Sequence, residues 1–309
     1  MKVLVTGGAG FIGSHVVDKL ISHGYEVSVV DNLSSGKQEN LNSSAKLYAA
    51  DIVEAKALDK VFEIERPDFV IHHAAQIDVQ ASMHDPALDA EVNILGAINL
   101  VKCSAIYKVK KLIYASSAAV YGDPAYLGLD EKHPVKPVSF YGISKHTPEH
   151  YLQVFAYLNQ IRYCVLRYAN VYGPRQASKG EGGVVAIFVD RLLRQQSPFI
   201  YGDGEQTRDF VYVKDVASAN LAALGHGNND IFNISSNTQT SVNQLFAICS
   251  DLAKSGLEPI YKAARPGDIV HSYLDNNKAK AELGWSPEYS LYQGLKDTIS
   301  YYSPSKSIL

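Results

Sequence analysis

Short apolar runs alternate with stretches of helical spacing over the first 170 or so residues of the chain. Runs rich in Val, Leu and Ile predict strands, and apolar residues three or four positions apart predict helices between them. The predicted strands are residues 2–6, 26–30, 46–50, 69–72, 111–116 and 163–167, and the predicted helices are residues 11–23, 55–65, 87–107 and 141–159. This alternation indicates an α/β protein with a doubly wound parallel sheet, a Rossmann fold.

The pattern becomes less regular after about residue 168, where glycine and proline interrupt the chain. The segments predicted there are a helix at residues 184–194 and two buried strands, at residues 210–213 and 231–234, that return to the main sheet. We therefore expect a first domain, the Rossmann domain, at residues 1–168, with returning segments near residues 209–237. A smaller, interleaved C-terminal α/β domain at residues 169–309 is expected to hold the substrate.

Composition excludes several classes of protein. Of 309 residues, 46% are hydrophobic and 20% charged, and the net charge of −3 provides no electrostatic footprint for nucleic acid. No apolar run reaches the roughly 18 residues of a membrane span, and a strand that begins at Lys2 leaves no room for a signal peptide. Cys103, Cys164 and Cys249 lack metal-site spacing and indicate a reducing compartment. We expect a cytoplasmic protein with no membrane partner and no metal site.

Three glycines, Gly7, Gly10 and Gly13, separate the first predicted strand from the first predicted helix. In a dinucleotide-binding turn, the first glycine permits the tight turn, the second lets a pyrophosphate approach, and the third allows close helix–strand packing. The phosphates then lie at the helix N-terminus, where free N–H groups favour negative charge. Asp31 ends the second strand and would bond the ribose hydroxyls. Its charge would repel a 2′-phosphate, which favours NAD over NADP.

Two further strand ends extend the predicted cofactor site. Asp51-Ile52 follows the third strand, where a side chain can meet the adenine edge. Ala74-Ala75 follows the fourth strand and is small enough to line a groove that holds a dinucleotide. The adjacent His72 and His73 point to opposite faces of their strand, and a structural role is favoured over catalysis.

The segment Tyr141-Gly-Ile-Ser-Lys145 carries a candidate catalytic pair. A phenol four residues before an amine places both groups on one helix face. The ammonium favours the phenolate and lowers a pKa that is ordinarily about 10. Tyr141 can therefore take a proton from a substrate hydroxyl near neutral pH, beside a dinucleotide that accepts the hydride.

Together these motifs resemble the extended short-chain dehydrogenase/reductase family and, within it, the UDP-glucose 4-epimerases (UDP-galactose 4-epimerases), over nearly the whole chain. The segments that carry the resemblance are residues 7–13, 31–36, 72–76, 93–96, 116–122, 141–145, 167–175, 202–204, 208–209 and 265–268. The resemblance implies that Tyr141 is the base, that Lys145 tunes it and holds the nicotinamide ribose, and that Ser117 bonds the reacting oxygen.

The motifs and the resemblance together imply NAD as the cofactor. The expected cofactor-binding residues are Gly7, Gly10, Phe11, Ile12, Gly13, Asp31, Asn32, Ser35, Gly36, Asp51, Ile52, His73, Ala74, Ala75, Gln76, Asn93, Ala115, Tyr141, Lys145 and Tyr168.

The resemblance further implies a UDP-sugar substrate and a homodimer that forms through the helices near residues 87–107 and 141–159. The expected substrate-binding residues are Ser117, Tyr141, Asn170, Val184, Tyr201, Arg208, Arg265 and Asp268. Asn170 and the two arginines would contact the diphosphate, since guanidinium groups suit phosphate oxygens, and Asp268 would contact the uridine ribose. For either arginine alone, a surface ion pair is an equally good interpretation.

The residues after Ser117 separate the possible reactions of a 4-keto sugar. Family dehydratases carry Asp-Glu there and decarboxylases carry Glu, whereas this chain has Ala118-Ala119, which cannot move a proton. We therefore expect C4 epimerisation of UDP-glucose and UDP-galactose, with hydride returned to the opposite face. In the family that the chain resembles, a bulky residue at the position of Ser272 is associated with exclusion of an N-acetyl group, so the resemblance extends the expectation to UDP-GlcNAc and UDP-GalNAc. A one-residue shift of the alignment would place Tyr273 there instead.

Three alternatives and one irregularity stay open at this point. The alternatives are an epimerase of UDP-glucuronate or a UDP-pentose, a net oxidoreductase of the same family, and a non-catalytic NAD-sensing protein on this fold. Pro148, three residues beyond Lys145, predicts a kink in the helix that carries the catalytic pair.

Overall fold

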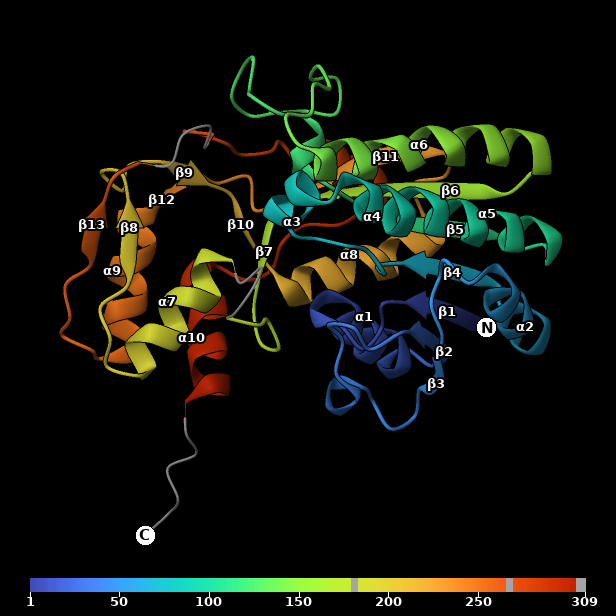
Figure 1. Ribbon diagram of the computed structural model, residues 1–309, viewed down its shortest axis with the longest axis horizontal. Coiled ribbons are helices and arrows are strands. Elements are labelled where there is room, and N and C mark those ends of the chain that lie inside the picture. Colours follow the sequence, from blue (N-terminus) through green and yellow to red (C-terminus); the bar gives the residue numbers. More distant parts are fainter. Residues whose placement is uncertain (179–182, 265–268, 304–309) are drawn as a thin grey trace, which may run out of the picture.

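A seven-stranded parallel sheet forms the centre of the computed structural model, which describes residues 1–178, 183–264 and 269–303 (Figure 1). From one edge to the other, the strands are β11 (Asp230–Ile234), β6 (Arg162–Tyr168), β5 (Lys111–Ser117), β4 (Phe69–His72), β1 (Lys2–Thr6), β2 (Glu26–Asp31) and β3 (Lys46–Ala49). Each neighbouring pair is parallel. The predicted α/β class and the Rossmann arrangement are confirmed.

Successive residues of each strand point to opposite faces of the sheet, so the sheet has two cores. On β1, Val3 and Val5 belong to one core and Leu4 to the other, and all three are fully buried. The helices of the first core are α1 (Phe11–Ser22) and α8 (Val213–Gly225), and those of the second are α2 (Ala55–Glu65), α5 (Gly96–Ile106) and α6 (Phe140–Asn159). Helices on both faces make the sheet doubly wound.

The order of the strands reverses beside β1, which lies between β2 and β4. At such a switch point, the connections after neighbouring strands run to opposite faces of the sheet. A crevice therefore forms at the carboxyl ends of β1 and β4, and it positions the site described below.

The second half of the chain forms a smaller body beside the sheet, on the left of Figure 1. Its strands pair in twos: β7 (Asn170–Tyr172) with β10 (Phe210–Tyr212), β9 (Thr207–Arg208) with β12 (Thr240–Ser241), and β8 (Phe199–Tyr201) with β13 (Ile260–Lys262). Its core lies among α7 (Val184–Leu193), α9 (Val242–Ala253) and α10 (Leu291–Tyr302).

Only one of the two predicted returning strands joins the main sheet. β11 pairs with β6 as expected, but the prediction for residues 210–213 was wrong, because β10 pairs with β7 instead. The free edge of β6 is already taken by β11, which leaves β10 to pair outside the sheet. The domain boundary at residue 168 stays a prediction.

Two helical segments differ from the expected pattern. The predicted helix at residues 87–107 is divided into α4 (Pro86–Ala90), a π-helical turn at Glu91–Leu95, and α5, and the short helix α3 (Val79–His84) precedes it. α6 runs through Pro148 without ending, so Tyr141 and Lys145 share one continuous helix. None of the helices in the described ranges is both long and apolar enough to span a membrane.

Candidate active site

A cavity lies at the switch point of the sheet and gathers most of the predicted cofactor residues. All of them line it except Gln76 and Asn93. The lining residues that the sequence did not predict are Val30, Ser34, Ala50, Ile77, Val92 and Ser116. Val30, Ala50 and Ser34 lie at strand ends or in the turn after Asp31, so the motifs could have indicated them. Ile77 and Val92 come from irregular segments beside α3 and α4, which carry no motif.

The turn between β1 and α1 brings backbone closer than any side chain would allow. Gly7 has a φ of +69°, in the left-handed region that favours glycine. A Cβ on Gly13 would lie 2.1 Å from the carbonyl oxygen of Gly7. α1 therefore starts directly against β1, with its free N–H groups at the cavity, which is the arrangement that binds phosphate.

Asp31 is a buried residue at the end of β2. It accepts hydrogen bonds from the backbone N–H groups of Ala9 (2.9 Å) and Leu33 (2.8 Å). Each oxygen keeps a second lone pair for a ligand hydroxyl. Asp51 lies next to it along the cavity and accepts from the Asn32 side chain (2.8 Å). This end of the cavity is acidic and suits an adenosine ribose.

Tyr141 and Lys145 line the cavity from successive turns of α6. Ser139 caps the helix by accepting from the Gly142 N–H (3.1 Å), and the Tyr141 N–H donates to Ser82 Oγ (3.1 Å). The Lys145 ammonium donates to the Ala115 carbonyl (2.7 Å). Burial lowers the pKa of Lys145 to about 8, against the opposing effect of Asp89 and Glu149. Lys145 is therefore protonated at neutral pH.

Ser117 ends β5 and accepts a hydrogen bond from the Ala119 N–H (3.2 Å) in the short 3₁₀ turn Ala118–Val120. Ser117 itself is not among the lining residues, although its neighbour Ser116 is. The carboxylates among the described lining residues, Asp31 and Asp51, belong to the acidic end. Asp89 and Glu149, which raise the pKa of Lys145, are not among the described lining residues.

Gln76 and Asn93 lie outside the lining of the cavity and bind one another. The Gln76 N–H donates to Asn93 Oδ1 (2.8 Å), and Asn93 Nδ2 donates to the Gln76 carbonyl (2.9 Å) and to Ser144 Oγ (2.9 Å). Asn93 thus ties the segment after β4 to α6. Their predicted contact with the cofactor stays a prediction.

The Nε2 atom of His73 lies 3.0 Å from the hydroxyl oxygen of Tyr168 and is hydrogen-bonded to it. The same hydroxyl oxygen accepts a hydrogen bond from Asn220 Nδ2 (2.8 Å). Burial and the nearby Lys145 lower the pKa of His73 to about 3, so the ring is neutral. Its Nδ1 is buried and has no hydrogen-bond partner among the described residues. A ligand in the cavity is the natural partner for such an atom.

Apart from Ser117 and Tyr141, the described substrate candidates lie in the smaller body and do not line this cavity. Asn170 is exposed at the start of β7, Val184 begins α7, and Tyr201 ends β8. Arg208, on β9, donates to the carbonyls of Thr207 (2.8 Å) and Val270 (3.3 Å). Arg265 and Asp268 fall outside the described residues. Substrate binding by these residues stays a prediction.

Comparison with known proteins places the chain in a family. Residues 3–235 match the sequence model of the NAD dependent epimerase/dehydratase family. The chain belongs to this family. The predicted resemblance, the NAD cofactor and the assignment as an NAD-dependent epimerase are thereby confirmed.

Three solved structures are similar to this epimerase/dehydratase over almost its whole length. A UDP-glucose 4-epimerase of Thermotoga maritima, with UDP-glucose, is 50% identical, with a TM-score of 0.96 and 98% of each chain covered. A UDP-glucose 4-epimerase of Thermus thermophilus, in complex with NAD, is 39% identical, with a TM-score of 0.93 and 99% and 100% covered. A UDP-N-acetylglucosamine 4-epimerase of Methanobrevibacter ruminantium, in complex with UDP-N-acetylmuramic acid, is 37% identical, with a TM-score of 0.93 and 97% of each chain covered.

The described residues fit the cofactor that this family uses. The glycine turn leaves a cradle that a Cβ would fill, Asp31 offers free lone pairs, and His73 Nδ1 lacks a partner at the cavity wall. These three features lie along one cavity, as an extended dinucleotide requires.

Proposed function

We propose that this enzyme interconverts the C4 epimers of a UDP-hexose, UDP-glucose and UDP-galactose, through a 4-keto sugar. The observation that carries the proposal is the cavity around Tyr141 and Lys145, whose described lining brings no carboxylate beside them. Ala118 and Ala119, directly after Ser117, cannot act as acid or base. Without such a group, a 4-keto sugar held there cannot lose water or carbon dioxide. The reaction that remains is return of the hydride to C4.

In the proposed mechanism, Tyr141 removes the proton of the 4-hydroxyl group and later returns it. When bound, NAD⁺ supplies the chemistry of accepting a hydride and giving it back. Lys145 stays charged at neutral pH, because its pKa is about 8, and it stabilises the phenolate of Tyr141. The Ala115 carbonyl fixes the position of the ammonium. Ser117 is assigned the hydrogen bond to the reacting oxygen.

We assign the two halves of the chain to the two ligands. Residues 1–168 would hold NAD, and residues 169–309 the nucleotide sugar, with Asn170, Val184, Tyr201, Arg208, Arg265 and Asp268 on the UDP side. Anchoring of the diphosphate with few charged contacts to the hexose would let the keto sugar turn over and present its other face.

An N-acetylated sugar pair is a second candidate substrate, favoured by the segment around Ser272. Ser272 is half-buried, and its N–H donates to the Thr207 carbonyl (3.2 Å), next to Arg208. The hydroxyl of Tyr273 instead packs against Gly128, 3.0 Å from where its Cβ would lie. The small side chain of Ser272 would leave room for an N-acetyl group. The relative from Methanobrevibacter ruminantium is named for such a substrate.

We further propose a homodimer in a reducing cytoplasm. α6 leaves a row of apolar side chains exposed, which are Ile143, Val154 and Leu158. Leu88 and Leu95, before α5, are also exposed. The exposure of these apolar side chains supports a dimer in which they would be buried against a second copy. All three cysteines are buried and free of disulfides, which supports the location.

Incubation of the purified enzyme with UDP-galactose, without added cofactor, tests the proposed function. UDP-glucose should appear with no net NADH, and Tyr141→Phe should lose about 10² to 10⁴ in rate while it retains bound NAD. UDP-glucuronate and a UDP-pentose are the matched alternative substrates. Faster turnover of either one would overturn the choice of hexose, and tightly bound NAD without any turnover would indicate a sensor.

A further inference from the structure

A buried carboxylate lies where the smaller body meets the edge of the main sheet. Asp209 stands between β9 and β10 and is 3% exposed. Its Oδ1 accepts hydrogen bonds from the backbone N–H (2.8 Å) and the hydroxyl (2.7 Å) of Ser236, and its Oδ2 accepts one from the N–H of Leu274 (3.3 Å). Asp209 does not line the cofactor cavity, and the proposed chemistry does not use it.

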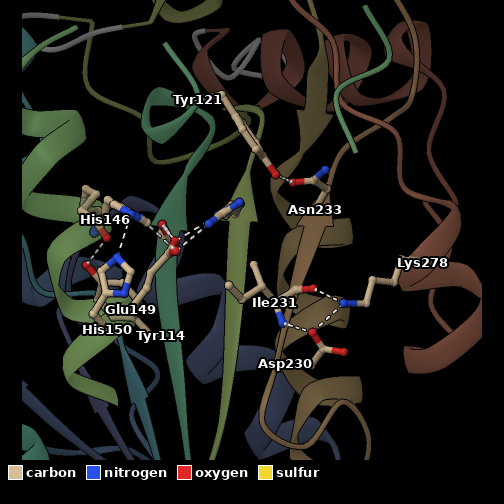
Figure 2. A network of polar contacts seen from close by, with 12 residues as sticks. Tyr114, Tyr121, His146, Glu149, His150, Asp230, Ile231, Asn233 and Lys278 are labelled. Atoms are coloured by element: carbon tan, nitrogen blue, oxygen red, sulfur yellow. Dashed lines mark hydrogen bonds and ion pairs between the residues drawn. The ribbon is translucent and has the colours of Figure 1, made fainter. Parts of the chain in front are cut away.

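The partners of this carboxylate belong to segments that are held to β11, the edge strand. Figure 2 shows Asn233 of β11, whose Oδ1 accepts a hydrogen bond from the hydroxyl of Tyr121 (2.7 Å). Asn233 Nδ2 donates to the carbonyl of Asp275 (3.2 Å), and the hydroxyl of Ser235 donates to the carbonyl of Leu274 (3.0 Å). These bonds fix both segments that the carboxylate contacts to the main sheet.

The residues on the other side of Asp209 are those assigned to the nucleotide sugar. The carbonyl of Asp209 accepts a hydrogen bond from the N–H of Asn170 (2.9 Å), and Arg208 precedes Asp209 in the chain. The Arg208 guanidinium donates to the carbonyl of Val270 (3.3 Å), in the segment that leads to Ser272. One buried residue therefore connects the substrate candidates of the smaller body to the sheet at whose crevice the cofactor cavity lies.

We propose that Asp209 is a positioning residue of the nucleotide-sugar site, which holds Arg208 and Asn170 in place against the edge of the main sheet. This inference rests on the proposed function, because the contact of these two residues with the diphosphate is part of it. A guanidinium group binds phosphate through a planar set of donors, so its binding depends on where its backbone is held.

The charge of this carboxylate makes its hydrogen bonds strong. Burial raises the pKa of Asp209 to about 6, against the opposing effect of the bonds from Ser236 and Leu274, so the group is ionised at neutral pH. Hydrogen bonds to an ionised acceptor are stronger than those between neutral groups, and they offset the cost of burying the charge.

Equilibrium binding of UDP to the enzyme with its bound NAD tests this role, measured by isothermal titration calorimetry. In Asp209→Asn, an amide N–H replaces one acceptor oxygen and faces the N–H of either Ser236 or Leu274, so one of the two segments is released. We expect the Kd for UDP to rise at least about tenfold, because buried donors are left without an acceptor. KM for UDP-galactose should rise with it, while kcat changes by less than about threefold and the NAD content stays constant.

Asp215→Asn is the matched control. Asp215, in the first turn of α8, is also buried, and burial raises its pKa to about 6 as well. It accepts hydrogen bonds from the N–H groups of Glu288 (2.8 Å) and Tyr289 (3.3 Å), which are not among the residues assigned to the substrate. Asp215→Asn should lower the Tm about as much as Asp209→Asn does, with the Kd for UDP unchanged.

Ser236→Ala provides a milder variant, since it removes one hydroxyl donor to Asp209 and should raise the Kd for UDP about twofold or more. An unchanged Kd in Asp209→Asn, or in Ser236→Ala if Asp209→Asn does not fold, would overturn the positioning role. An equal loss of UDP binding in Asp215→Asn would also overturn it. A parent protein that does not bind UDP would overturn the proposed function together with this inference, whereas equal binding by parent and variants would remove the inference alone.

Discussion

At the scale of single residues, the charge on Lys145 sets the pH range of the proposed reaction. Burial lowers the pKa of this amine from an ordinary value of 10.5 to about 8. The ammonium, which stabilises the Tyr141 phenolate, is present below that pH and is lost above it. We expect kcat for UDP-galactose to fall as the pH rises through about 8, while the NAD content stays constant. A rate that is flat from pH 7 to 10 would contradict this role of Lys145.

The size of residue 272 should decide between plain and N-acetylated sugars. In Ser272→Tyr, the added ring would fill the space assigned to the N-acetyl group. We expect kcat/KM for UDP-GlcNAc to fall about 10- to 200-fold, the usual effect of a steric change in a pocket, with UDP-galactose little affected. Ser272→Ala is the control and should keep both activities. An unchanged kcat/KM for UDP-GlcNAc in Ser272→Tyr would contradict the assignment of residue 272 to the space for the N-acetyl group.

Residues that end strands were predictable from the sequence, and residues that act through packing were not. Asp31 and Ala74-Ala75 follow apolar runs, and the runs alone place them at one edge of a parallel sheet. Asn93 carries a family motif, yet it binds Gln76 and Ser144 outside the lining of the cavity, because the π-helical turn directs it toward α6. The partner of His73, Tyr168, lies 95 residues away, a pairing that no local pattern indicates.

At the scale of elements, a buried ion pair ties α6 to β6. Arg167 and Glu149 are both almost fully buried, and two hydrogen bonds (2.6 and 3.0 Å) join them. Glu149→Gln would leave the guanidinium buried without its counter-charge, at a cost of about 3–5 kcal/mol in the free energy of unfolding. Asp190→Asn breaks an exposed pair with Arg194 and should cost under about 1 kcal/mol. Denaturant unfolding compares the two, and equal losses would contradict the prediction.

The pH dependence of the same pair has a definite sign. Burial would raise the pKa of Glu149, but hydrogen bonds from His146 and Arg167 outweigh it and lower the pKa from 4.5 to about 2. A carboxylate of this kind stabilises the fold above its ordinary pKa and loses that contribution as the pH falls toward 2. The difference in stability between the parent and Glu149→Gln should therefore shrink between pH 4.5 and 2.

Most elements followed the hydrophobic pattern, and the failures have a common cause. Strands β1 and β4 and helix α2 begin and end where the apolar periodicity places them. β10 and β11 are both short buried runs, so the apolar pattern alone predicts equally well that either one pairs with the edge of the sheet. Their partners are decided by tertiary competition for one strand edge, β6, which is not encoded within either segment.

At the scale of the whole molecule, the exposed face of α6 predicts the oligomeric state. Val154 and Leu158 are 57% and 68% exposed, and a charge at each should prevent burial against a second copy. We expect Val154→Glu with Leu158→Glu to convert a dimer into a monomer in sedimentation equilibrium. Ile64→Glu, on the exposed side of α2, is the control and should leave the dimer intact. A parent protein that sediments as a monomer would contradict the proposed contact.

The late position of β11 and α8 in the chain has a consequence for synthesis on the ribosome. The sheet that begins at Lys2 obtains its last strand only at Ile234, and α8 covers part of one of its faces. A nascent chain that stops at Tyr168 exposes the unpaired edge of β6 and apolar side chains that α8 would cover. Such surfaces favour aggregation, so the N-terminal half should need protection by a chaperone until about 230 residues have emerged.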